Sequence, residues 1–323
     1  MNSKLQSYLN VIDESVQNFQ LPKNPKQLYE PMRYILALGG KRIRPVLTLM
    51  ACELFKGEHS TAKNAALAVE LFHNFSLVHD DIMDQAPLRR GEPTVHKKWN
   101  ENIAILSGDA LLIESYKLLC SYDAKLSQKL LHIFNTTASE VCEGQQTDMD
   151  FETQKIVSID EYVEMIRKKT AVLLGCSLKM GALVGGASDK VADDLYQFGV
   201  NLGIAFQLQD DILDVYADQS KFGKQVGGDI IANKKTYLLL LAHQNANENQ
   251  KSVLEKSISE SDASIKVQHI MAVYNELKIQ EKATSKMNAF YEIAMNNLKH
   301  LSLPEEKKQP LKDLAEFLMG REV

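Results

Sequence analysis

The chain has 323 residues, of which 45% are hydrophobic and 24% are charged, and its formal net charge is −5. This composition supports a sizeable core, and the lack of a basic excess disfavours a nucleic-acid partner. The four cysteines show no C-x-x-C spacing, which argues against a zinc site or a disulfide framework and favours a cytoplasmic protein. The N-terminus lacks the order of a signal peptide and no apolar window is long enough to cross a membrane, so we expect no membrane anchor.

Helical periodicity dominates the chain. Apolar residues recur at three- and four-residue intervals in six long runs, at residues 45–55, 65–84, 104–119, 126–148, 159–184 and 192–216. Turn residues separate the runs, strand-like alternation is nearly absent, and no Gly/Ser-rich linker divides the chain. We therefore predict an all-α fold of ten or more helices that pack as a single domain over residues 1–323.

The first unusual feature in chain order is the basic run "GGKRIRP" at residues 39–45. It places Lys41, Arg42 and Arg44 directly before a helix that Pro45 can open at its first position. Cations at this end of a helix oppose its dipole, whereas an anion would be bound by free backbone N–H groups and basic side chains together. We interpret the run as an anion site, and the alternative is ordinary surface basicity.

Two acidic motifs of equal spacing follow, "FSLVHDDIMD" at residues 75–84 and "AFQLQDDILD" at residues 205–214. On a helix Asp80 and Asp84 lie about 40° apart and about 6 Å along the axis, so both face one way. The second motif repeats the arrangement, and its aspartates are Asp210, Asp211 and Asp214. Like charges at this spacing destabilise an isolated helix, so two matched copies are unlike a solvated surface and favour a binding function.

Carboxylates without histidine or cysteine neighbours suit Mg²⁺, which is typically bound by one or two carboxylates together with phosphate oxygens. About three Mg²⁺ ions would balance six aspartates, which indicates more than one ion beside a polyphosphate. Basic residues after each motif add positive charge, and they are Arg89, Arg90, Lys221, Lys224, Lys234 and Lys235. His73 lies about two turns before Asp80 on the same helix face, where it either contacts a diphosphate or is structural.

The chain resembles the trans-isoprenyl diphosphate synthases, the farnesyl and geranylgeranyl diphosphate synthase family, over about residues 30 to 240. The motifs that support the resemblance occur in the family's order: "GGKRIR", "HDDIMDQAPLRRG", "SGDALL", "GQQTD", "KKTA", "FQLQDDILD", "FGKQVGGDI" and "NKKT". The resemblance implies an all-α fold with helices around a central cavity, usually as a homodimer.

The resemblance also assigns roles to single residues. It implies that Mg²⁺ is bound by Asp80, Asp84 and Asp210, supported by Asp81, Asp211 and Asp214, with Asp148 as an additional contact found in some members. Isopentenyl diphosphate would be held by Lys41, Arg44, His73 and Arg90. The allylic diphosphate would be held by Arg89, Lys169, Gln207, Lys224 and Lys234, and Thr170 would line the reaction centre. The implied reaction is the 1′-4 condensation of the two substrates.

Product length depends on what closes the tunnel for the growing chain. Phe75 lies about 7.5 Å and Phe72 about 12 Å before Asp80 along the helix, and as i,i+3 neighbours they can plug the tunnel together. The alternative is that both are ordinary core residues. The first motif lacks the two-residue insertion of many bacterial farnesyl synthases and resembles archaeal-type geranylgeranyl synthases. We predict a C20 product, geranylgeranyl diphosphate, ahead of C15, farnesyl diphosphate, with longer chains disfavoured.

Other functions stay open at this point. A longer-chain polyprenyl synthase shares the motifs, and some family assemblies contain a non-catalytic subunit, although such subunits have degraded motifs and both motifs are intact here. A terpene cyclase also uses a DDxxD motif, but it does not need "GGKRIR". The sequence does not identify the preferred allylic starter among dimethylallyl, geranyl and farnesyl diphosphates.

Overall fold

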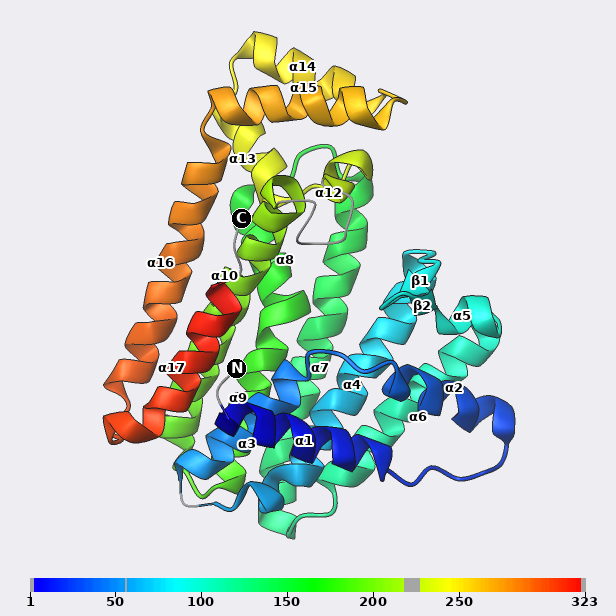
Figure 1. The fold of residues 1–323 in the computed structure, drawn as a ribbon, viewed down its shortest axis with the longest axis vertical. Helices are drawn as coiled ribbons and strands as arrows, with labels where there is room; N and C mark the ends of the chain where they lie inside the picture. Colours follow the sequence, from blue (N-terminus) through cyan, green and yellow to red (C-terminus); the bar gives the residue numbers. More distant parts are fainter. Residues whose placement is uncertain (1–2, 56, 218–226, 321–323) are drawn as a thin grey trace. The chain divides into compact units, whose positions relative to one another are not determined.

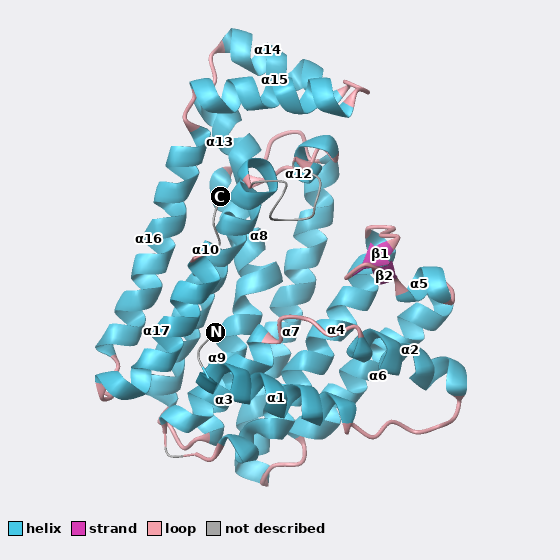
Figure 2. Ribbon diagram, viewed as in Figure 1, coloured by secondary structure: helices cyan, strands magenta, loops and turns pink. Residues whose placement is uncertain are grey.

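The computed structural model describes residues 3–55, 57–217 and 227–320. It confirms the predicted all-α fold of more than ten helices, and the regular structure of these residues otherwise contains one short pair of strands (Figure 2). The chain divides into two compact units. The first comprises Met1–Thr136, Cys176–Tyr196 and Ser302–Leu311, and the second comprises Thr137–Gly175, Gln197–Leu301 and Lys312–Val323.

The first unit contains the helix α4 (Lys63–Met83), which ends in the first acidic motif. The elements of this unit are α1 (Ser3–Gln17), α2 (Lys26–Ala37), α3 (Ile43–Leu54), η1 (His59–Ala62), α4, β1 (Leu88–Arg89), β2 (Glu92–Pro93), α5 (Val95–Lys98) and α6 (Glu101–Leu119). The strands β1 and β2 pair antiparallel, with Leu88 opposite Pro93 and Arg89 opposite Glu92. Four further helices supply residues to both units: α7 (Ala124–Thr153), α9 (Val172–Val184), α10 (Asp189–Tyr216) and α17 (Glu305–Met319).

The elements of the second unit contain the second acidic motif and the "KKTA" segment. They are α8 (Ile159–Ile166), the π-helical turn η2 (Arg167–Ala171), α12 (Gly228–Ile231), α13 (Tyr237–Asn245), α14 (Glu248–Ile258), α15 (Ala263–Glu276) and α16 (Ile279–His300). Figure 1 shows α14 and α15 packed side by side. Within this unit α13 contacts α8, α15 and α16.

The core of the first unit is built on α4, which packs along α6 and α3 (Figure 1). Buried apolar residues such as Leu71, Val78 and Leu111 fill the space between these helices. Gly108 on α6 permits the close approach, because a Cβ atom at this position would lie 2.4 Å from Nε2 of His79 on α4. The packing fixes the rotation of α4 and therefore the directions of the aspartates at its C-terminal end.

Most of the apolar run at residues 171–186 forms the helix α9, which contains small residues and packs in the core. A Cβ atom at Gly181 would lie 2.1 Å from the carbonyl oxygen of Thr48, and one at Gly185 would lie 2.4 Å from that of Cys52. The glycines, one helical turn apart, therefore let α9 lie directly on the backbone of α3. Among the described residues, no helix combines the length and apolar character that a membrane crossing requires.

Two local predictions were wrong. The helix after the basic run begins at Ile43 rather than at Pro45, which occupies its third position; proline is tolerated there because the first N–H groups of a helix have no partner within it. The run at residues 159–184 is not one continuous α-helix, because the π-helical turn η2 separates α8 from α9. Such turns are frequent at functional positions.

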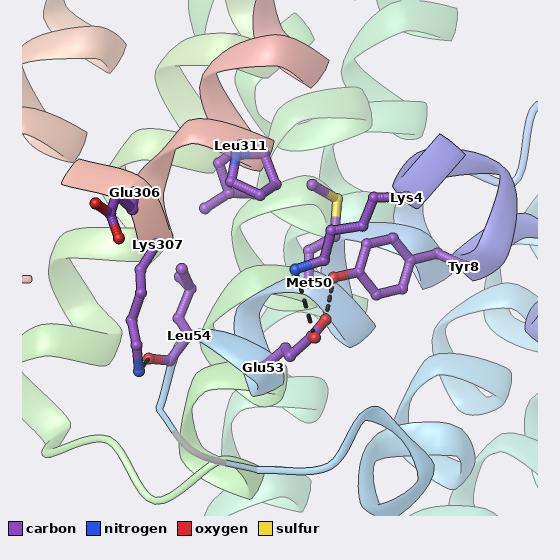
Figure 3. A pocket seen from close by; sticks show the side chains of 9 residues that line it. Lys4, Tyr8, Met50, Glu53, Leu54, Glu306, Lys307 and Leu311 are labelled. Carbon is purple, nitrogen blue, oxygen red and sulfur yellow. Dashed lines mark hydrogen bonds and ion pairs between the residues drawn. The ribbon is translucent and has the colours of Figure 1, made fainter. Parts of the chain in front are cut away.

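A cavity of about 250 Å³ in the first unit lies between α1, α3 and the beginning of α17 (Figure 3). The Tyr8 hydroxyl donates a hydrogen bond to Glu53, and Lys4 Nζ lies 3.4 Å from Glu53 Oε1. Lys307 Nζ donates to the carbonyl oxygen of Leu54 over 3.0 Å. None of the predicted site residues lines this cavity, so we assign its polar contacts to holding the helices together.

Candidate active site

The first acidic motif lies at the C-terminal end of α4. The Asp84 N–H donates to the Asp80 carbonyl oxygen over 2.8 Å, so the two residues are one turn apart on the same side of the helix. Asp80 is half-buried and Asp84 is exposed. The helix dipole disfavours anions at this end, and a bound cation would remove that cost. The predicted pairing of these carboxylates on one helix face is therefore present.

Asp81, between them, points into the protein. It is only 1% exposed, and its Oδ1 accepts hydrogen bonds from Arg89 Nη2 and, over 3.0 Å, from Arg89 Nε. Burial raises the pKa of Asp81, and the hydrogen bond from Arg89 partly offsets this effect. Asp81 therefore fixes the position of Arg89 on the β1–β2 hairpin, rather than presenting Oδ1 to a ligand.

A cluster of basic side chains forms around His73 on α4. Arg44 Nη1 lies 3.2 Å from His73 Nε2, and Arg90 donates to the carbonyl oxygen of Gly39. Gly40 leaves room for Arg90, because a Cβ atom there would lie 2.7 Å from Arg90 Nη2. Three of the four residues predicted to hold one diphosphate, Arg44, His73 and Arg90, thus gather in the first unit, and Lys41 lies exposed in the same basic run.

The cations of the basic run have different surroundings. Arg42 is buried, pairs with Glu70 and donates to the carbonyl oxygen of Leu36 over 2.8 Å. Arg44 is half-buried, and its buried Nε has no hydrogen-bond partner among the described residues. Burial lowers the pKa of Arg44 to about 10, an effect that the nearby Arg90 increases. Arg42 is therefore a structural cation, whereas Arg44 can still bind an anion.

His73 is neutral near pH 7. Burial lowers its pKa well below the usual value, and the neighbouring arginines, Arg44 and Arg90 foremost, lower it further. A guanidinium group can only donate hydrogen bonds, so the contact from Arg44 makes Nε2 the acceptor and leaves the proton on Nδ1. The cluster thus combines donor groups and net positive charge, which is the chemistry that binds a diphosphate.

The His73 environment predicts a pH effect on stability. The folded pKa lies below the unfolded value of about 6.5, so the unfolded chain binds more protons and stability falls as the pH drops from about 7 to 5. In His73→Gln, which keeps an acceptor for Arg44, this fall should be smaller by about 1–2 kcal/mol. Denaturant unfolding of the ligand-free protein at several pH values measures the difference. Equal pH slopes in both proteins would contradict the assignment of a neutral His73.

The second acidic motif, on α10 in the second unit, repeats the design of the first. Asp211 is buried like Asp81, and its Oδ2 accepts from the Tyr162 hydroxyl over 2.6 Å and from the Tyr237 N–H over 3.3 Å. Burial raises the pKa of Asp211 to about 7. The outer aspartates, Asp210 and Asp214, are half-buried. In both motifs, therefore, the middle aspartate is buried and hydrogen-bonded within the protein, whereas the first and last aspartates are more accessible and lie together on another side of the helix.

Asp214 also organises the segment that follows the motif. Its Oδ2 accepts from the Asp229 N–H over 2.9 Å, and its carbonyl oxygen accepts from the Gly227 N–H over 2.7 Å. Farther along, the Lys234 N–H donates to the Asp229 carbonyl oxygen over 2.9 Å, and Lys234 is exposed. The predicted lysine Lys224 lies outside the described residues, as does Lys221.

The π-helical turn η2 presents the residues of "KKTA". Lys169 Nζ lies 2.6 Å from Asp148 Oδ2 on α7, and Thr170 Oγ1 donates to Gln207 Oε1 on α10 over 3.4 Å. Gly144 on α7 accommodates the turn, because a Cβ atom there would lie 2.3 Å from the Lys169 nitrogen. The second unit thus brings together four predicted site residues: Asp148, Lys169, Thr170 and Gln207.

The two predicted product-length residues belong to an aromatic cluster in the first unit. The rings of Phe72 and Phe75 lie 5.5 Å apart, and Phe72 meets Phe134 of α7 edge-on at 5.1 Å. Tyr116 of α6 packs against Phe134 at 5.2 Å. Phe72 is fully buried, whereas Phe75 is half-buried and lies closer to the acidic motif.

The donor set of the acidic motifs fits a hard divalent cation, because all candidate ligands are carboxylate oxygens. Residues 3–55, 57–217 and 227–320 contain no preassembled group of three or more His, Cys, Asp or Glu side chains able to hold a metal ion. Phosphate oxygens of a substrate would therefore be expected to complete the coordination.

Comparison with known proteins identifies the family. Residues 25–277 match the family model described as polyprenyl synthetase. The chain belongs to this family. A geranylgeranyl diphosphate synthase of Methanosarcina mazei is 42% identical over 72% of each chain, and one of Saccharolobus solfataricus is 36% identical over 97% of this chain and 96% of the relative. A crystal structure of a geranylgeranyl pyrophosphate synthase covers 100% of both chains with 44% identity and a TM-score of 0.94.

Family membership confirms several predictions. This polyprenyl synthetase is an enzyme, a prenyltransferase of the isoprenyl diphosphate synthase type. Its family uses isoprenyl diphosphates as substrates and a divalent metal for catalysis. Relatives with other products exist, since a geranylfarnesyl diphosphate synthase of Natronomonas pharaonis is 35% identical over 96% of this chain and 95% of the relative.

Several residues that organise this polyprenyl synthetase site were missed at the sequence level. Glu70, which pairs with Arg42, had a detectable signal because it is a charged residue within the apolar run of α4. Tyr162, Tyr237 and Gly144 had none, because their roles come from contacts between segments that are far apart in the sequence.

Proposed function

We propose that this prenyltransferase condenses isopentenyl diphosphate with allylic diphosphates, head to tail, to geranylgeranyl diphosphate. The observation that carries the proposal is the Arg44–His73–Arg90 cluster, a group with net positive charge in a chain that carries two DDxxD motifs. Farnesyl diphosphate is the second candidate product. The geranylgeranyl diphosphate synthases among the relatives favour C20.

The basic residues divide between the two substrates. Isopentenyl diphosphate is held by Lys41, Arg44, His73 and Arg90, where Arg44 and Arg90 supply charge and His73 donates through Nδ1. The allylic diphosphate is held by Arg89, Lys169, Gln207, Lys224 and Lys234. Asp81 fixes Arg89, and the contact of Lys169 with Asp148 keeps its ammonium group extended before substrate binds. Each assignment follows the resemblance, and Lys224 lies outside the described residues.

Asp80, Asp84 and Asp210 would hold about three Mg²⁺ ions when the substrates are bound. The middle aspartates Asp81 and Asp211 support these ligands through their buried hydrogen bonds to Arg89 and Tyr162. Asp214 supports them by ordering the segment that begins at Gly227, and Asp148 is an additional metal contact. When bound, the metal would neutralise charge on the departing diphosphate.

The reaction breaks the allylic C1–O bond and forms a bond from C1 to C4 of isopentenyl diphosphate. Lys169, Arg89 and Lys234 stabilise the negative charge that develops on the leaving diphosphate. Thr170 and Gln207 line the cationic centre, and the released pyrophosphate accepts the proton that the condensed product loses from C2. Exclusion of water protects the allylic cation from hydrolysis.

The test is an assay of the purified chain with Mg²⁺, isopentenyl diphosphate and each of the three allylic starters in turn, with products resolved by chain length. Pyrophosphate release with a C20 main product supports the proposal. The matched control is Asp80→Asn, which keeps the side-chain shape and removes the charge, and it should lose nearly all activity. A longer main product would favour a longer-chain polyprenyl synthase. A cyclic hydrocarbon formed from the allylic substrate alone would favour a terpene cyclase, and the absence of any reaction would favour a non-catalytic subunit.

We further propose that the chain is one functional domain that acts as a homodimer in the cytoplasm. Apolar side chains are exposed on α6, where Ile105 is 42%, Leu106 60% and Ile113 55% accessible. Such a face is compatible with a subunit contact. Sedimentation equilibrium of the wild-type chain measures the oligomeric state, and a monomer at micromolar concentration would contradict the dimer.

A further inference from the structure

Tyr162 lies on α8 in the second unit, one residue after a capping box. The Ser158 side chain accepts from the Glu161 N–H over 3.2 Å, and Glu161 accepts from the Ser158 N–H over 2.8 Å. These reciprocal bonds fix the first turn of the helix. The Tyr162 side chain, which is 2% exposed, points inward from this turn. The backbone from which the Tyr162 side chain extends is therefore fixed by hydrogen bonds within α8 and its cap.

The Tyr162 hydroxyl donates to Asp211 Oδ2 over 2.6 Å, which is a short bond to a buried carboxylate. Burial and the neighbouring Asp211 raise the pKa of Tyr162 well above its usual value, so the hydroxyl keeps its proton and acts as a donor. The other bond to the same oxygen, from the Tyr237 N–H, is longer at 3.3 Å. Tyr162 is thus the main contact that orients this oxygen.

The remaining oxygen of Asp211 continues the network. Its Oδ1 accepts from Gln207 Nε2 over 3.4 Å, and Gln207 Oε1 accepts from Thr170 Oγ1 over 3.4 Å. Because the amide nitrogen can only donate and the carboxylate only accepts, this contact decides which end of the Gln207 amide faces Thr170. The series of hydrogen bonds runs from Tyr162 to Asp211, then to Gln207 and Thr170, and it links α8, α10 and η2.

We propose that Tyr162 is a positioning residue of the prenyl transfer site, which acts through Asp211 to orient the amide of Gln207 and the hydroxyl of Thr170. The inference rests on the proposed function, in which these two residues line the reaction centre. Both 3.4 Å contacts are long, so they are weak on their own. Without the Tyr162 hydroxyl the Asp211 carboxylate keeps only the longer bonds from the Tyr237 N–H and from Gln207, so it orients Gln207 and Thr170 less firmly.

The decisive variant is Tyr162→Phe, which keeps the buried ring and removes the hydroxyl. We expect kcat to fall by about tenfold, equal to about 1.4 kcal/mol in the activation barrier. The KM for the allylic diphosphate should rise a few-fold, while the KM for isopentenyl diphosphate stays unchanged, because the residues assigned to that substrate belong to the first unit. A residue that only packs the core would not separate kcat and the two KM values in this way.

The matched control is Tyr274→Phe on α15. Tyr274 is also fully buried in the second unit. Asp211 lies near enough to raise its pKa, but among the described residues Tyr274 makes no hydrogen bond to Asp211, Gln207 or Thr170. Its kinetic constants should equal those of the wild type. Thermal unfolding of both variants shows whether any loss of rate comes from a loss of fold.

A double-mutant cycle with Gln207→Leu tests the route. If Tyr162 acts through Gln207, the double variant should have the rate of Gln207→Leu alone, because the second change removes nothing further. Unchanged kinetics in Tyr162→Phe, an equal loss in Tyr274→Phe, or rate losses that multiply in the double variant would each overturn the inference. An inactive wild type would overturn the proposed function itself, which separates the two failures.

Discussion

Replacing Arg44 with methionine is expected to raise the KM for isopentenyl diphosphate by about 100-fold, which corresponds to about 2.7 kcal/mol, a typical cost of removing one partner from a buried charged contact. Arg44 is half-buried, lies against a neutral His73, and has a buried, unpartnered Nε among the described residues. The nearby carboxylate, Glu70, is paired with Arg42, so a bound anion would supply the direct anionic partner that Arg44 lacks among these residues. Steady-state kinetics with varied isopentenyl diphosphate at saturating allylic substrate measure the effect.

The same substitution should leave the ligand-free protein as stable as the wild type or more stable by about 1 kcal/mol. Arg44 forms no ion pair among the described residues, the nearby Glu70 is already paired with Arg42, and an apolar chain of similar length replaces the charge. Arg33→Met is the matched control. Arg33 lies on α2 in the same unit, is largely exposed, and donates to the carbonyl oxygens of Leu21 and Pro22. Its KM values should be unchanged. An Arg44→Met protein with wild-type KM would remove Arg44 from the substrate site.

The basic run also shows how far the sequence could predict the site. The run "GGKRIRP" predicted an anion site, and Arg44, His73 and Arg90 do gather. The sequence could not tell which arginine is structural, because that depends on Glu70, which lies 28 residues from Arg42 along the chain. Local spacing reports the face of a helix, whereas the partner of a charge depends on how helices pack.

The acidic motifs also show that helical spacing predicts which residues share a face, but not which of them are buried. Helical spacing correctly placed Asp80 and Asp84 on one side of α4. The resemblance gave Asp81 as a support for these ligands, and in the structure this residue is buried and its Oδ1 accepts from Arg89. The boundary between exposed and buried faces is set by the close contact of α4 with α6 at Gly108. A motif alone contains no information about that contact.

The fold was predictable because most helices have strong apolar periodicity. The run at 159–184 had the same periodicity, yet it contains the turn η2, where the residues of "KKTA" follow a wider π-helical path. The reason lies in another helix, since Gly144 of α7 leaves the space that the Lys169 backbone occupies. A pattern read along one segment does not report a feature that two segments create together.

Replacing Phe75 with alanine is expected to shift the main product from C20 to C25, and replacing both Phe72 and Phe75 to lengthen it further. The Phe75 ring lies 5.5 Å from that of Phe72 and 4.7 Å from that of His79, so it is the first layer of the aromatic cluster below the acidic motif. Phe72, about 4.5 Å farther along the helix axis, forms the second layer with Phe134. Each removal extends the space for the growing chain by one layer.

The two substitutions should differ in their effect on stability. Phe72 is fully buried against Phe75 and Phe134, so its loss should cost about 3–5 kcal/mol, whereas the half-buried Phe75 should cost less. Products are therefore compared at a temperature where thermal unfolding shows both variants folded. Phe290→Ala, a half-buried phenylalanine on α16 in the second unit, is the matched control and should keep the C20 product.

The outcome decides between the two interpretations of the cluster. If the phenylalanines close the tunnel, chain length must increase in Phe75→Ala and increase again in the double variant, in steps of one prenyl unit. If they are ordinary core, the variants lose stability and rate, but their product stays C20. The result most damaging to the tunnel interpretation is a folded, active Phe72→Ala/Phe75→Ala protein with an unchanged product, because α4 would then contain no phenylalanine.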